Sequence, residues 1–153
     1  ALAEADPDSA ADFEANAEAY RRQLSELDEA YEASLGSCER ELLVVAHDAF
    51  WWLAERYGLE QEPIAGLSPE QEPDPRRLAE LVALVEEEGV TTVFTETLVT
   101  PAVAETLARE AGIETEVLDP LEGLSEERLA AGETYLSVME ANLAKLEDAL
   151  GCG

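Results

Sequence analysis

The stretch Leu42-Leu43-Val44-Val45-Ala46, which ends at His47, is a short and wholly apolar run. A run of this length is typical of a strand buried in a parallel sheet. From there on, the sequence alternates four times between a short apolar run and a helix-length segment. The predicted strands are 42–46, 64–67, 91–95 and 113–118, and the predicted helices are 48–57, 74–88, 101–111 and about 126–150. Because parallel neighbours need crossover helices, this alternation predicts an α/β fold with a four-stranded parallel sheet flanked by helices.

A long amphipathic helix is predicted upstream of this sheet. Asp6-Pro7 is a typical helix start and Gly36 is a typical helix end. Between them, apolar side chains recur at spacings of three and four, at Phe13, Ala17, Tyr20, Leu24, Leu27, Tyr31 and Leu35. Such a helix is about 43 Å long, whereas the rest of the chain forms a globule roughly 35 Å across. We therefore expect the helix either to pack on a partner or to lead to another domain upstream.

Composition limits the class of protein. The chain has 153 residues, 46% of them hydrophobic, which is enough for one core of single-domain size. No apolar run approaches the roughly 20 residues that span a bilayer, and any export signal is expected before Ala1. The formal net charge is −27, with 36 acidic residues against nine lysines and arginines. This charge repels nucleic acid, which we exclude as a partner, and it either concentrates cations or serves solubility at high salt.

Two cysteines flank the predicted sheet. Cys38 precedes the first strand and Cys152 follows the last helix. They can form a disulfide if the two ends of the domain meet, and such a bond implies an oxidising compartment. Two unpaired thiols in a cytosolic protein are the alternative.

Polar side chains follow the predicted strands, at the edge of the sheet where open α/β folds bind ligands. They include His47, which is the only histidine, and the acidic residues Glu70, Glu96 and Asp119. Imidazole and carboxylate are normal zinc ligands. Each residue also has a structural interpretation: His47 as a hydrogen-bonded strand end, Glu96 as the acid before a helix, and Asp119 as the start of a turn.

Motifs of common enzymes are missing from the sequence. The turn after the first strand has no glycine to approach a dinucleotide pyrophosphate. There is no G-x-S-x-G elbow, and neither cysteine has a histidine close to it in sequence. We therefore predict that the protein is not an enzyme.

Five segments, in this order and spacing, resemble the solute-binding proteins of zinc and manganese ABC importers, the cluster A-I metal-binding lipoproteins. They are Ala46-His47-Asp48-Ala49-Phe50, Gly66-Leu67-Ser68-Pro69-Glu70-Gln71-Glu72-Pro73, Val93-Phe94-Thr95-Glu96, Val117-Leu118-Asp119-Pro120-Leu121-Glu122-Gly123-Leu124 and Tyr135-Leu136-Ser137-Val138-Met139-Glu140-Ala141-Asn142-Leu143. The resemblance covers nearly the whole chain.

The resemblance implies one lobe of a two-lobed metal-binding receptor. Residues 1–36 are then the long helix that connects the lobes, and residues 37–153 are the C-terminal α/β lobe. The implied partners are a missing N-terminal lobe and an ABC permease, with the protein anchored on the outer side of a membrane. The exposed face of the long helix is a candidate for self-association.

The resemblance also implies the metal site. His47 and Asp119 are the two ligands that this lobe supplies, and Glu96 is a candidate to orient His47. Histidine, rather than glutamate, at the first position favours Zn²⁺ over Mn²⁺. Two protein ligands are fewer than a closed zinc site needs, so this chain alone is expected to bind zinc weakly. A disulfide between Cys38 and Cys152 is implied as well.

The sequence departs from the family pattern at Trp51-Trp52, where a small residue and one aromatic are usual. We expect the two indoles to pack against the long helix, and the alternative is that they narrow the metal cleft. Two alternative functions stay open at this point. They are a manganese or iron receptor of the same family, and a surface adhesin or interaction module that does not depend on metal.

Overall fold

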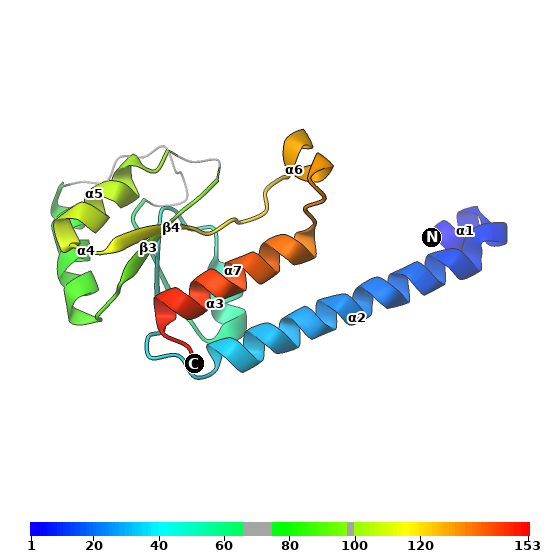
Figure 1. The fold of residues 1–153 in the computed structure, drawn as a ribbon, viewed down its shortest axis with the longest axis horizontal. Helices are drawn as coiled ribbons and strands as arrows, with labels where there is room; N and C mark the ends of the chain where they lie inside the picture. Colours follow the sequence, from blue (N-terminus) through cyan, green and yellow to red (C-terminus); the bar gives the residue numbers. More distant parts are fainter. Residues whose placement is uncertain (66–74, 98–99) are drawn as a thin grey trace.

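The computed structural model describes residues 1–65, 75–97 and 100–153. Its centre is a parallel sheet whose strands are β1 (Leu42–Val45), β2 (Glu60–Pro63), β3 (Thr92–Thr95) and β4 (Glu114–Val117). The strands lie in the order β2-β1-β3-β4 (Figure 1). The predicted four-stranded parallel sheet is confirmed. The chain adds β2 on one side of β1 and then β3 and β4 on the other side, so the topological switch point lies between β1 and β3. Open α/β sheets form their ligand crevice at this point.

Helices cover both faces of the sheet, as predicted. In the described part of the chain they are α1 (Leu2–Ala5), a 3₁₀ turn (Pro7–Ser9), α2 (Ala10–Leu35), α3 (Trp51–Tyr57), α4 (Pro75–Glu87), α5 (Ala102–Ala111), α6 (Glu126–Ala130) and α7 (Tyr135–Leu150). Leu43, Val45 and Phe94 pack with α2, α3 and α7 in one core. Val44 and Val93, which alternate with them along the strands, pack with α4 and α5 in the other.

The second strand lies earlier than predicted. It was expected at 64–67, but β2 is Glu60–Pro63, paired with β1 in a register that joins Leu42 to Glu60. An edge strand has one side open to solvent and needs no apolar run, so its polar sequence gave no signal. The ladder continues into the predicted segment, where the amide of Ile64 donates to the carbonyl of Val45 at 2.9 Å. Residues 66 and 67 lie outside the described residues.

The predicted final helix is broken in two. Residues 131–134 separate α6 from α7, and Gly132 adopts a φ of 86°, which side chains disfavour. Thr134 then starts α7 with a capping box in which its side chain and that of Ser137 each accept a backbone N–H. Leu129, which was expected in the buried stripe, is 56% exposed because it lies on α6.

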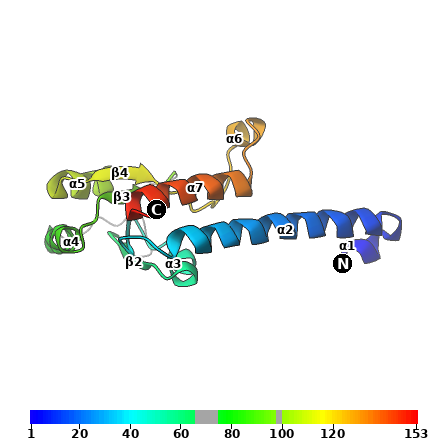
Figure 2. The ribbon, with the colours of Figure 1, turned by 60° about the horizontal axis from the view of Figure 1, so that its bottom comes forward.

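The long helix α2 is anchored only at its end. Of its residues, only Tyr31 and Leu35 are buried, and Figures 1 and 2 show the rest running away from the sheet. The Tyr31 hydroxyl donates to the carbonyl of Met139 on α7 at 2.7 Å. Arg56 of α3 pairs with Asp28 at 2.7 Å. No helix of the described residues is long and apolar enough to cross a membrane.

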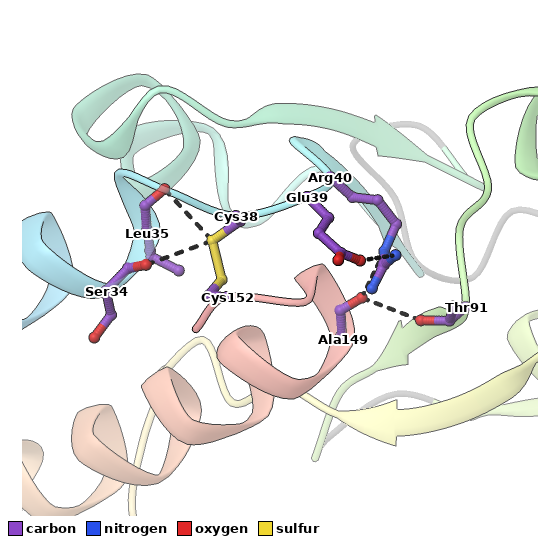
Figure 3. Close-up of a disulfide and its surroundings, with 8 residues drawn as sticks. All are labelled: Ser34, Leu35, Cys38, Glu39, Arg40, Thr91, Ala149 and Cys152. Carbon is purple, nitrogen blue, oxygen red and sulfur yellow. Dashed lines mark hydrogen bonds and ion pairs between the residues drawn. A yellow bond between two sulfur atoms is a disulfide. The ribbon is translucent and has the colours of Figure 1, made fainter.

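A disulfide joins the two ends of the α/β unit. Cys38, after α2, is bonded to Cys152, after α7, across 114 residues (Figure 3). Beside it, the guanidinium of Arg40 and the hydroxyl of Thr91 both donate to the carbonyl of Ala149, at 3.2 and 3.1 Å. The amino end of the sheet is therefore fixed by one covalent bond and by hydrogen bonds from Arg40, which precedes β1, and Thr91, which precedes β3.

Both edge strands are acidic. β2 carries Glu60 and Glu62, and β4 carries Glu114 and Glu116. All four residues of β4 are exposed. Lys145 of α7 lies against this edge, where its ammonium donates to the carbonyl of Val117 at 2.6 Å and pairs with Glu116 at 3.3 Å.

Candidate metal site

His47 lies at the carboxyl end of β1, at the centre of the sheet. β1 and β3 are neighbours, so their ends bring His47 next to Glu96. The imidazole Nδ1 lies 2.5 Å from the carboxylate Oε1 of Glu96. The two residues are only 7% and 5% exposed. The predicted proximity of these two strand ends is therefore present in the structure.

The contact between these atoms is close but is not aligned as a hydrogen bond. Neither Nδ1 of His47 nor Oε1 of Glu96 has a hydrogen-bond partner within the described residues. Buried polar atoms without partners are rare and need an explanation. Because Nδ1 faces a carboxylate, Nε2 is the nitrogen that such a histidine presents to a metal.

The pKa of Glu96 shows which charges surround the pair. Burial raises the pKa of this carboxyl above its usual value, and His47 opposes that rise. The negative charge of Glu122 raises the pKa of Glu96 further. Glu122 itself is exposed.

Asp119, the second predicted ligand, is buried with both carboxylate oxygens engaged. Oδ1 accepts the amide of Leu121 at 2.8 Å, and Oδ2 pairs with the guanidinium of Arg128 at 2.7 Å. The backbone of Asp119 is held by the side chain of Asn142, which accepts its N–H at 3.1 Å and donates to its carbonyl at 2.8 Å. Its carboxylate oxygens and its backbone N–H and carbonyl therefore all have partners among the described residues.

A turn of unusual backbone conformation joins Asp119 to Glu122. Leu121 has a φ of 58°, the only positive φ among the described residues other than glycine. The left-handed conformation costs a residue with a side chain roughly 1–2 kcal/mol. Such strain is often found at functional sites. Glu122, the next residue, was not singled out from the sequence, although it lies in the segment 117–124 that carried the family resemblance.

The other strand-end acids do not join this group. The Asp48 carboxylate accepts the side-chain amide of Gln61 on β2. Glu70 lies outside the described residues. Within residues 1–65, 75–97 and 100–153, no group of three or more histidine, cysteine, aspartate or glutamate side chains is placed to hold a metal ion. A complete metal shell is not formed by the described part of this chain.

A cavity of about 320 Å³ lies beside Asp119 and Leu121, between α3 and α7. Trp52 lines it. The expected packing of the two indoles against the long helix is wrong, since Trp51 is 50% and Trp52 is 77% exposed. Their rings contact each other edge to face, with centroids 4.6 Å apart. Trp52 is therefore the indole of this pair that lines the cavity.

The chain matches known proteins over nearly its whole length. A family model described as "Zinc-uptake complex component A periplasmic" matches residues 1–149. The zinc-binding lipoprotein AdcA of Streptococcus pneumoniae strain R6 is 46% identical over 141 residues, which are 92% of this chain and 28% of that protein.

Two solved structures share the fold. The Zn(II)-bound ZnuA-like domain of Streptococcus pneumoniae AdcA matches with a TM-score of 0.79 and 44% identity, over 97% of this chain and 56% of that one. The laminin-binding protein Lmb of Streptococcus agalactiae, described as bifunctional with adhesin and metal-transporting activity, matches with a TM-score of 0.85 and 36% identity over the same shares.

The fold is the one shared with these two solved structures. The chain belongs to the family of periplasmic zinc-uptake component A. It spans 28% of the curated relative and a little over half of the two solved chains.

Proposed function

We propose that this chain is the C-terminal lobe of an extracytoplasmic zinc receptor that delivers Zn²⁺ to an ABC permease. The observation that carries the proposal is the buried contact between His47 and Glu96 at the switch point of the sheet. It is supported by the family of the chain and by the zinc-bound relative. Residues 1–36 serve as the connecting helix and residues 37–153 as the lobe.

We further propose which atoms hold zinc. Nε2 of His47 is one ligand, and Glu96 orients the ring from its other nitrogen. The sequence alone favours Asp119 as the second ligand. Because both oxygens of Asp119 are engaged, we propose Glu122, an exposed carboxylate three residues further along the same turn, in its place.

This lobe supplies fewer ligands than the four of a closed zinc site. Zinc is therefore bound weakly by the chain alone, with water filling the remaining positions, and tightly when the N-terminal lobe adds its ligands. The imidazole at the first position favours zinc over manganese or iron. In this function the protein binds and releases its cargo and performs no catalysis. Self-association through α2 stays a prediction.

Adhesion is a second candidate, because Lmb is described as both an adhesin and a metal transporter. Its test is binding of the chain to immobilised laminin with and without a zinc chelator. Adhesion that is independent of zinc and of His47 would favour an interaction module. Absence of laminin binding would leave metal transport as the function.

The test of zinc binding is calorimetric titration of Zn²⁺ into the chain and into His47→Ala, Glu122→Gln and Asp119→Asn. High salt screens the acidic surface, and Glu110→Gln on the exposed side of α5 controls for loss of one acidic charge. We expect His47→Ala to abolish saturable binding and Glu122→Gln to weaken it more than Asp119→Asn does. Equal binding by the wild type and His47→Ala would refute the site.

A further inference from the structure

The segment 47–50 links β1 to α3 and carries His47 at its start. On the upstream side the sheet holds the backbone: the amide of Ala46 donates to the carbonyl of Phe94 at 2.9 Å, and the carbonyl of Ala46 accepts the amide of Ala65 at 3.0 Å. Residues 47–50 themselves belong to neither a strand nor a helix. The sheet ladder alone therefore does not fix the direction in which His47 leaves β1.

Gln61 of β2 holds this segment with both ends of its side-chain amide. Its Oε1 accepts the backbone N–H of Phe50 at 2.7 Å, and its Nε2 donates to Oδ1 of Asp48. Because Gln61 pairs with Leu43 in the parallel register, its side chain lies on the face of the sheet that α3 covers. One amide group therefore bridges two of the three residues that follow His47.

The bond to Phe50 also completes the start of α3. Phe50 is the N-cap residue of this helix, and its own side chain makes no cap hydrogen bond. In a capping box, the N–H of the N-cap residue is bound by a glutamate or glutamine side chain three residues on. Here that position is Leu53, so Gln61 takes this role from the neighbouring strand. The contact therefore fixes the start of α3 relative to β2.

The two contacts require a side chain that accepts at one end and donates at the other. Phe50 offers an N–H and Asp48 offers a carboxylate, so the carbonyl of Gln61 must face Phe50 and its NH₂ group must face Asp48. A glutamate at position 61 would keep the first contact but would set its second oxygen against the Asp48 carboxylate. The link can therefore be tested by exchanging the two polar groups.

We propose that Gln61 is a positioning residue for zinc binding, which holds the segment 47–50 so that His47 keeps Nδ1 against Glu96 and Nε2 toward the metal. This inference rests on the proposed function. Nδ1 of His47 has no hydrogen-bond partner among the described residues, so the direction of the ring depends on the backbone that carries it. Gln61 itself is not a ligand, since both ends of its amide are engaged.

The experiment exchanges the polarity of the pair and measures zinc affinity by competition with a chromogenic chelator at high salt. The variants are Gln61→Met, Gln61→Glu, Asp48→Asn and the double variant Gln61→Glu/Asp48→Asn, which keeps the net charge of the wild type. Gln23→Glu, on an exposed position of α2, controls for the added charge.

We expect Gln61→Met to weaken zinc binding about tenfold, as loss of an outer partner of a metal ligand does, and Gln61→Glu to weaken it more. Asp48→Asn alone should bind zinc nearly as the wild type does, because its amide oxygen still accepts from Gln61. The double variant should regain most of the affinity that Gln61→Glu loses, because the amide at position 48 then donates to the carboxylate at position 61.

Two further readouts separate positioning from a purely structural role. Denaturant unfolding without zinc gives the folded fraction of each variant, so that affinities are compared for folded protein. The visible absorption of bound Co²⁺ should change in Gln61→Met and return in the double variant. If Gln61→Met does not fold, the comparison of Gln61→Glu with the double variant decides.

Two results would overturn the proposal. They are wild-type zinc affinity in Gln61→Met, and an affinity of the double variant no higher than that of Gln61→Glu. If His47→Ala loses zinc while the Gln61 variants keep it, only this inference fails. If His47→Ala binds zinc as the wild type does, the proposed function fails as well.

Discussion

The two ends of the sheet differ in how their polar groups are satisfied. At the amino edge, the Cys38–Cys152 disulfide and the hydrogen bonds to the carbonyl of Ala149 leave a closed and rigid border. At the carboxyl edge, His47 and Glu96 are buried with atoms that lack hydrogen-bond partners among the described residues. The difference teaches that the covalent closure of the fold lies at one end of the sheet, whereas the buried contact between His47 and Glu96 lies at the other.

Replacing both cysteines by serine should have the largest effect on stability. The bond closes a segment of 114 residues, for which chain entropy gives about 4–5 kcal/mol. Denaturant unfolding measures the loss, with Ser37→Ala as the local control. Zinc affinity of the folded variant should stay within twofold of the wild type. A large loss of zinc affinity in that variant would show that the two ends are not independent.

Glu96→Gln tests the carboxyl end of the sheet, where we expect zinc affinity to change and stability to stay nearly the same. The substitution keeps the shape of the side chain but removes the charge that faces Nδ1 of His47. We expect about a tenfold loss of zinc affinity, because partners of metal-bound histidines contribute to this extent, and little loss of stability. Glu105→Gln on α5 is the matched control. Unchanged zinc affinity would mean that Glu96 does not orient the ring.

Trp52→Ala should have the smallest effect on stability. The indole is 77% exposed, and substitutions at exposed positions usually change stability by less than about 0.5 kcal/mol. Phe50→Ala, three residues after His47 and buried in the core with Phe94, should cost about 3–5 kcal/mol. Thermal unfolding of both variants checks the contrast. A large loss in Trp52→Ala would restore the interpretation of this residue as part of the core.

The sequence predicts those features that depend on apolar patterns. The central strands and the helices on both faces follow from hydrophobic runs, and His47 and Glu96 follow from the rule for parallel strand ends. The polar strand β2 and the break before Thr134 were missed, because an edge strand and a short turn leave no apolar signal. Arg128 could not be placed, since its partnership with Asp119 depends on that break and on side-chain directions.

The glutamates on the outer strands have a consequence for aggregation. A sheet with unpaired edges can be extended by a second molecule that adds its own strand. Here a second copy approaching β4 would set its glutamates against Glu114 and Glu116, and one approaching β2 would meet Glu60, Glu62 and the missing N–H of Pro63. At neutral pH this repulsion keeps the sheet four strands wide, and concentrated solutions of the protein should resist growth into fibrils.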